Sequence, residues 1–306
     1  MGFKKIILWL IAIFLSIFYF LIDESNEDKF SQLNLSSENT PTYKDRIENF
    51  SSQVFNDKNQ TTHLIEASAY ESYQNQPDLL IQPKISFFKE SSQELDYVLT
   101  ADQGRSLDNG DYLLTGSISI QSNSGKKHIM QSNTMIYRKE TQDMISEDTV
   151  TYFSDKDNLK ANGMHMVPKK DKLTFTGNTE IKKETGSRII SSDVIVDKED
   201  NKNIFKSDQP STFHSNDDEV SSEGFEYKEN AAQITLLGNT KLIQPNGTLI
   251  NSKNLIIDNS GENEVFKTGE LIDYQSKVSK IYSKGMVYDP KSKKLNLFNG
   301  VEGEYK

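Results

Sequence analysis

Residues 173–181, LTFTGNTEI, carry the pattern that decides the fold. Positions 173, 175, 179 and 181 are Leu, Phe, Thr and Ile, position 177 is Gly, and the positions between them are Thr, Asn or Glu. Successive side chains of a β-strand point to opposite faces, so this alternation predicts a strand with one apolar face. Glycine within the apolar column predicts a bend or a close approach of two backbones.

The same pattern returns every 61 residues. It reads YLLTGSISI at 112–120, ITLLGNTKL at 234–242 and LNLFNGVEG at 295–303, and Gly163, Gly224 and Gly285 follow the same spacing. A second line reads IMQSNTMIY from Ile129, IISSDVIVD from Ile189 and LINSKNLII from Leu249, at spacings of 60. Three registers that agree over several copies indicate an internal repeat.

The repeat predicts an all-β protein. Turn residues such as Asp108-Asn109-Gly110 and Pro245-Asn246-Gly247 separate the strands, and no amphipathic helix follows residue 23. Only 35% of the chain is hydrophobic, which favours a thin, elongated body. We expect an elongated open β-jellyroll built from about four repeats of 60–61 residues. A sandwich with a closed core fits the same pattern.

The N-terminus predicts a membrane anchor. Residues 6–22, IILWLIAIFLSIFYFLI, hold no charge and would span roughly 25 Å as a transmembrane helix. Lys4 and Lys5 precede the run, which orients residues 1–5 as a cytoplasmic tip. A cleaved signal peptide is the alternative, but the small residues of a cleavage site are missing. Residues 23–42 are polar and predict a flexible tether.

Composition excludes several classes of function. The net charge of −10 opposes binding to nucleic acid, and the absence of cysteine removes disulfides and thiol nucleophiles. No nucleophile or phosphate-loop motif occurs, and candidate calcium loops lack the required Gly and Glu. The four histidines, His63, His128, His165 and His214, are far apart in the sequence and are expected to be solvated or near turns. We therefore predict no catalytic residue, no metal site and no cofactor.

An apolar groove can hold acyl chains without any catalytic residue. Each buried CH₂ contributes about 0.8 kcal/mol. The candidate lipid-facing residues are alternate members of the apolar columns: Leu114, Ile118, Phe175, Ile181, Leu236, Leu242, Leu295 and Leu297. The same columns would equally form the dry core of a closed sandwich.

Four stretches resemble the LptC family of lipopolysaccharide export proteins. They are residues 43–88, residues 95–104 (LDYVLTADQG), residues 111–120 (DYLLTGSISI) and residues 284–305 (KGMVYDPKSKKLNLFNGVEGEY). The order of basic tip, membrane helix, tether and strands is also similar. Copies from about residue 189 onward resemble the LptA/OstA-type fold. Residues 43–181 then correspond to an LptC-like jellyroll, and residues 182–306 to additional OstA/LptA-like repeats, continuous with the first.

The resemblance implies a non-enzymatic carrier anchored in the inner membrane by one span, with its body in the periplasm. Such a protein accepts lipopolysaccharide from an inner-membrane ABC transporter and passes it along an apolar trough to a bridge protein of the LptA type. We expect both partners to dock by adding a strand to a free sheet edge. The candidate edge residues are Ile47, Phe50 and Phe55 at the transporter end, and Leu297, Val301 and Tyr305 at the far end.

A hypothesis from another class also fits the sequence. A membrane-tethered, repetitive β-protein with a closed core would act as a structural spacer or an adhesin. Such a protein would contain no lipid after purification and would not depend on a transporter.

Overall fold

The structure is a computed structural model that describes residues 43–305, apart from residues 124–127, 155–156, 171, 200–201, 216–217, 229–232 and 262. The expected cytoplasmic tip, membrane span and tether, residues 1–42, lie outside the described residues. In the part of the chain that is described, no helix is both long and apolar enough to cross a membrane.

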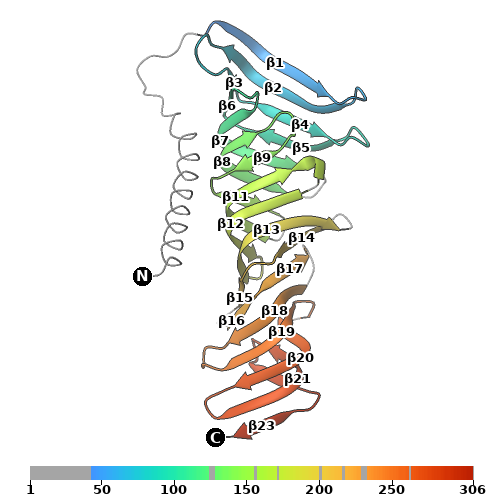
Figure 1. Cartoon of the computed structure of the whole chain (residues 1–306), viewed down its shortest axis with the longest axis vertical. Coiled ribbons are helices and arrows are strands. Elements are labelled where there is room, and N and C mark those ends of the chain that lie inside the picture. Colours follow the sequence, from blue (N-terminus) through green and yellow to red (C-terminus); the bar gives the residue numbers. More distant parts are fainter. Residues whose placement is uncertain are drawn as a thin grey trace, which may run out of the picture. The chain divides into compact units, whose positions relative to one another are not determined.

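Residues 43–306 form one compact unit, and its strands belong to one 23-stranded antiparallel sheet (Figure 1). The first twelve strands are β1 (Asp45–Phe55), β2 (Thr61–Ser72), β3 (Leu79–Ile81), β4 (Lys84–Phe88), β5 (Leu95–Thr100), β6 (Gln103–Ser106), β7 (Tyr112–Ser122), β8 (Ile129–Tyr137), β9 (Met144–Ser146), β10 (Val150–Phe153), β11 (Asp157–Val167) and β12 (Lys172–Lys183). The others are β13 (Arg188–Glu199), β14 (Lys202–Ser207), β15 (Ser211–Ser215), β16 (Asp218–Ser222), β17 (Gly224–Lys228), β18 (Gln233–Ile243), β19 (Leu249–Asp258), β20 (Val265–Gln275), β21 (Ser279–Asp289), β22 (Lys294–Leu297) and β23 (Glu302–Tyr305). A single turn of 3₁₀ helix, Pro168–Lys170, follows β11. The all-β prediction is confirmed.

The sheet folds back on itself into two half-sheets. Each long strand pairs with different short strands along its two halves: residues 119–122 of β7 pair with β5, whereas residues 112–115 pair with β6. Half-sheet I contains β4, β5, β10, β15, β16 and β23, and half-sheet II contains β3, β6, β9, β14, β17 and β22. The long strands run through both, which is the arrangement of a β-jellyroll.

The long strands bend where the half-sheets meet. The register of β7, β12 and β18 shifts at Gly116, Gly177 and Gly238, whose φ angles are 93°, 68° and 70°. Only glycine adopts this left-handed conformation without steric cost. The predicted bend is confirmed, and these corners, aligned from strand to strand, form a continuous edge that we call the spine.

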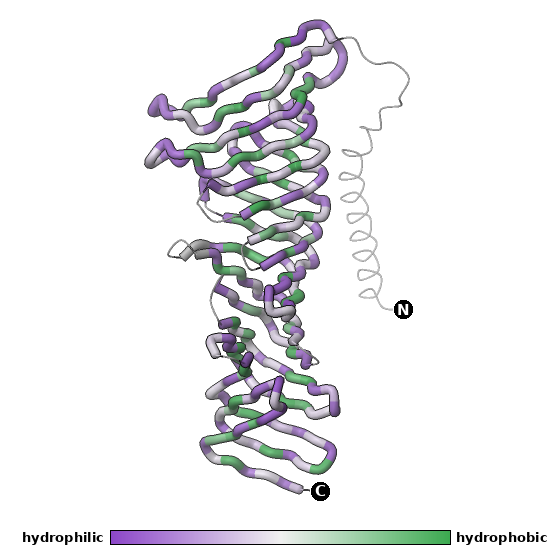
Figure 2. Tube along the Cα trace, turned by 180° about the vertical axis from the view of Figure 1, so that it is seen from behind, coloured by the Kyte–Doolittle hydropathy of each residue, from purple (hydrophilic) through white to green (hydrophobic). Residues whose placement is uncertain are grey.

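The hairpin tips lie at the opposite side of the jellyroll. Tips of half-sheet I, such as residues 56–60 and 184–187, face tips of half-sheet II, such as residues 138–143 and 290–293. We call the line between these two rows of tips the seam. Figure 2 shows apolar and polar residues alternating along the strands. Successive side chains of a strand point to opposite faces, so each half-sheet turns one apolar face toward the hydrophobic cluster inside.

Candidate functional site

The interior between the half-sheets contains the predicted lipid-facing residues. Leu114, Ile118, Phe175, Ile181, Leu236 and Leu242 are buried and belong to one hydrophobic cluster. Leu295 and Leu297 are partly buried and pack against the same cluster. Because the cluster extends from Ile65 in β2 to Tyr288 in β21, the interior is continuous through all the repeats.

Side chains from the two half-sheets meet inside the jellyroll. Phe87 of β4 lies edge-on to Tyr137 of β8, with ring centroids 5.7 Å apart. Phe213 of β15 lies edge-on to Phe266 of β20 at 5.9 Å. Side chains of facing sheets interdigitate when the sheets are about 10 Å apart. The interior expected to be an open trough is therefore filled by the protein's own side chains in this structure.

Two buried hydrogen bonds join the half-sheets across the seam. The Tyr227 hydroxyl of β17 donates to the Asp157 carboxylate at the start of β11. One repeat later, the Tyr288 hydroxyl of β21 donates to the Asp218 carboxylate of β16 over 2.8 Å. Both pairs are 70 residues apart in the sequence, and we call them the seam ties.

A lysine ammonium contacts one residue of each tie. The Lys293 ammonium lies 3.3 Å from each carboxylate oxygen of Asp218, whose side chain is fully buried. The Lys183 ammonium lies 3.9 Å from the centroid of the Tyr227 ring. Burial, followed by the hydrogen bond to Asp218, raises the pKa of Tyr288 above its usual range, so the phenol keeps its proton even where an exposed tyrosine would lose it.

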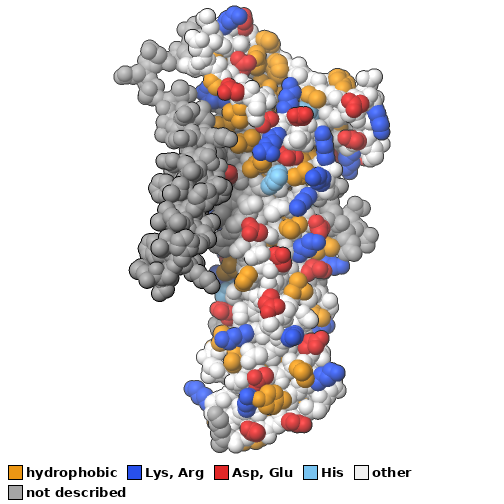
Figure 3. All heavy atoms as spheres, in the orientation of Figure 1, with side chains coloured by type: hydrophobic (Ala, Val, Ile, Leu, Met, Phe, Trp, Pro, Cys, Tyr) orange, Lys and Arg blue, Asp and Glu red, His pale blue; other side chains and the backbone are white. Residues whose placement is uncertain are grey.

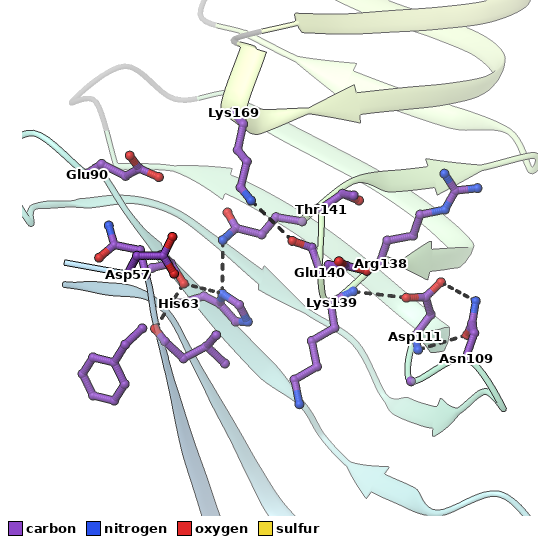
Figure 4. Close-up of a pocket in the computed structure, with 16 residues that line it drawn as sticks. Asp57, His63, Glu90, Asn109, Asp111, Arg138, Lys139, Glu140, Thr141 and Lys169 are labelled. Carbon is purple, nitrogen blue, oxygen red and sulfur yellow. Dashed lines mark hydrogen bonds between the residues drawn. The ribbon is translucent and has the colours of Figure 1, made fainter. Parts of the chain in front are cut away.

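A polar pocket of about 760 Å³ opens on the seam near the first strands. Residues 54–57, 62–63, 90, 109–111, 138–142 and 169 line it, so it lies among hairpin tips of both half-sheets. Figure 4 shows three basic side chains and four acidic ones among the residues that line it: Arg138, Lys139, Lys169, Asp57, Glu90, Asp111 and Glu140. The lining is thus polar and of mixed charge, in contrast to the apolar interior.

The outermost strands of the described body contain the predicted edge residues. Ile47, Phe50 and Phe55 lie in β1, which pairs only with β2. At the other end, β22 with Leu297 and β23 with Tyr305 pair only with β21, and Val301 lies between them. The other edge of each of these strands has no strand partner within the described residues. The Tyr305 side chain is 81% exposed.

The face of the body that Figure 3 shows carries no broad patch of one charge among the described residues. On the described face in Figure 3, acidic and basic side chains are interspersed. Among the described residues, no group of His, Asp or Glu side chains has the arrangement of a metal site.

A family model described as "Lipopolysaccharide-assembly, LptC-related" matches residues 8–181, more than half of the chain. The chain belongs to the LptC family. This family consists of non-enzymatic proteins of lipopolysaccharide transport. The match confirms the resemblance to the LptC family over residues 8–181, and the resemblance of the later repeats to the LptA/OstA-type fold stays a prediction. Proteins of the LptC family are typically periplasmic and anchored in the inner membrane. A search of curated proteins found no match.

In this LptC-family chain His63 lies close to the hairpin tip at residues 56–60, which is one of the two expected environments, but it is not solvated. Its side chain is fully buried instead of solvated, and its ring lies 5.9 Å from both Phe87 and Tyr137. Desolvation, followed by the charges of Lys139 and Lys169, lowers the pKa of His63 to about 4, so the imidazole is neutral at pH 7. One face of the residue lines the pocket and the other touches the core, so His63 forms the floor between them.

The seam ties were also missed, although the sequence holds a signal for them. Asp157 and Asp218 are 61 residues apart, and so are Tyr227 and Tyr288. This spacing is the repeat length. Repetition of both partners at that spacing could have indicated the pairs, but not that they lie opposite each other across the interior.

Loss of one seam tie should weaken the fold. Tyr288→Phe removes a hydroxyl that hydrogen-bonds a buried carboxylate, and we expect it to lower the free energy of unfolding by about 2 kcal/mol. Tyr137→Phe is the matched control, because the buried Tyr137 hydroxyl has no partner among the described residues. Its removal should change stability by less than about 0.5 kcal/mol or increase it. Urea unfolding of both variants measures this, and equal losses would contradict the tie.

Proposed function

We propose that this protein is a membrane-anchored periplasmic carrier. It accepts lipopolysaccharide from an inner-membrane ABC transporter and passes it along the apolar interior toward the outer membrane. Residues 6–22 are the proposed single span, and residues 43–306 are the proposed periplasmic body. In this proposal the energy for transport comes from ATP hydrolysis in the transporter.

The observation that carries this proposal is the continuous apolar interior, which extends along the whole jellyroll and ends at two strand edges. An acyl chain inside it would replace contacts between the protein's own side chains with contacts between those side chains and the lipid. The two kinds of contact have similar energy, since each buried CH₂ contributes about 0.8 kcal/mol. Contacts of this kind have no direction, so a chain can slide past Phe175 and Leu236 without breaking hydrogen bonds. The side-chain packing between the half-sheets must loosen while the lipid is inside.

We further propose that partners dock by strand addition. The transporter side would pair with β1, whose Ile47 and Phe55 are half exposed. The bridge protein would pair with β22 and β23. In both cases free backbone groups of an edge strand would supply the affinity.

A photo-crosslinking experiment tests the carrier function. A benzoylphenylalanine at Phe175 or Leu236, on the inward face, should form adducts with lipopolysaccharide in cells. The same residue at Thr176 or Thr235, the outward neighbours on the same strands, should not. Similar labelling of inward and outward positions would contradict transport through the interior.

The filled interior also fits the second hypothesis, in which the protein is a spacer or adhesin with a closed core. A closed core has no room for acyl chains. This hypothesis therefore predicts no adduct at Phe175 or Leu236, whereas the carrier requires one at both positions.

A further inference from the structure

We propose that the polar pocket beside His63 is the port through which the acyl chains of a lipid enter the interior, while the seam ties hold the later repeats shut. This inference rests on the proposed function and adds where the lipid enters. It follows from a difference between the first repeat and the two that follow.

The later repeats are closed by the seam ties. Each tie joins a carboxylate on half-sheet I to a phenol on half-sheet II, and both phenol rings are buried. A chain entering there must break a hydrogen bond between two desolvated groups. Asp157 then loses its phenol donor, and Asp218 keeps the Lys293 ammonium. A buried polar group that is left without a partner costs about 1–3 kcal/mol.

The first repeat lacks this closure. The 61-residue spacing puts Asp96 where later repeats have Asp157 and Asp218, and Met166 where they have Tyr227 and Tyr288. Asp96 lies near the tip end of β5, and Met166 near the tip end of β11. A thioether cannot donate a hydrogen bond, so no tie forms. Both residues are only half-buried.

The pocket lies on this untied part of the seam. Its lining comes from tips of both half-sheets, and Lys169 follows Met166 by three residues at the end of the same hairpin arm. The floor is His63, whose Nε2 is buried without a hydrogen-bond partner among the described residues. Beneath it are the rings of Phe87 and Tyr137, which belong to the core.

The chemistry of the pocket fits an amphiphile with a polar head. The polar, mixed-charge lining can hold the head at the rim, and the apolar rings below can receive the chains. His63 separates the two regions, and its Nε2 has no hydrogen-bond partner among the described residues. Displacing His63 therefore breaks only the polar contacts of its Nδ1 with Thr62 and Gln142.

The test compares two exposed tip positions in the full-length chain. Benzoylphenylalanine is placed at Thr141, in the pocket, or at Ser292, next to the tied Asp218–Tyr288 pair. The protein in detergent is mixed with purified lipopolysaccharide and irradiated. We expect at least five times more adduct at Thr141 than at Ser292, and Tyr288→Phe should raise the yield at Ser292 severalfold.

A substitution that adds the missing phenol gives the sharpest result. Met166→Tyr should tie the first repeat through Asp96 and lower the adduct at Thr141 at least fivefold. Met166→Phe, which adds the same ring without the hydroxyl, should retain most of the adduct. Thermal unfolding of both variants checks that they are folded.

Three outcomes would overturn the port. They are equal adducts at Thr141 and Ser292 in the unaltered chain, equal loss in the two Met166 variants, and no adduct at Thr141 when Phe175 and Leu236 are labelled. In the last case the carrier function survives, because lipid reaches the interior by another route. Absence of adducts at Phe175, Leu236 and Thr141 alike would end both proposals.

Discussion

Replacing Phe266 with alanine is expected to lower the free energy of unfolding by about 3–5 kcal/mol. The Phe266 side chain is fully buried and lies 5.9 Å from Phe213 and 5.8 Å from Tyr288, measured between ring centroids. Phe213 belongs to half-sheet I, so the ring packs across the interior. Its removal would leave a cavity that the two half-sheets cannot fill without moving together.

The size of this loss distinguishes a packed interior from an open one. In a lipid-free protein with a dry core the full loss should appear in urea unfolding. A ring facing an open trough would contribute only its partial burial, and the loss would fall below about 1.5 kcal/mol. Leu271→Ala is the control. Leu271 lies further along the same strand, β20, and is 75% exposed, so the change should stay within about 0.5 kcal/mol.

Placing proline at Leu297 should abolish binding of the bridge partner at the far end. The Phe298 backbone N–H donates to the Gly285 carbonyl. Hydrogen-bonded and non-hydrogen-bonded pairs alternate along an antiparallel ladder, so the N–H of Leu297, one residue earlier, points to the free edge. Proline there removes an outward donor and leaves the ladder between β21 and β22 in place.

The expected effect is a loss of at least a hundredfold in affinity for an LptA-type protein, measured by titration. Leu297→Ala keeps the N–H and removes only side-chain contacts, so it should retain most of the affinity. Unfolding of Leu297→Pro should resemble that of the parent chain. Unchanged partner binding by a folded Leu297→Pro variant would show that the far edge lies elsewhere.

The strands and their stacking could be predicted from the sequence because both depend on local patterns. Alternation within residues 173–181 defines a strand with one apolar face, and Gly177 defines its bend. The 61-residue spacing then implies that equivalent strands of successive repeats pair with their neighbours in the same register. These properties involve residues close together in the chain, where geometry leaves few alternatives.

The closure of the jellyroll could not be predicted in the same way. The alternating pattern says which side chains point inward, but not how far apart the two half-sheets lie. The burial of His63 could not be predicted, because nothing near it in the sequence reveals Tyr137 and Gln142, which reach it from β8 and the tip that follows. The seam ties likewise depend on residues 70 positions apart.

The bends at the repeated glycines have a consequence for the length of the jellyroll. Ile181 and Leu242 hold the same place in the period, each four residues after a corner at Gly177 or Gly238. A segment of 61 residues can therefore be inserted or deleted between them, and every long strand still pairs with a strand that is bent at the same place. Evolution can thus adjust the length of the jellyroll in whole repeats and leave its outermost strands unchanged.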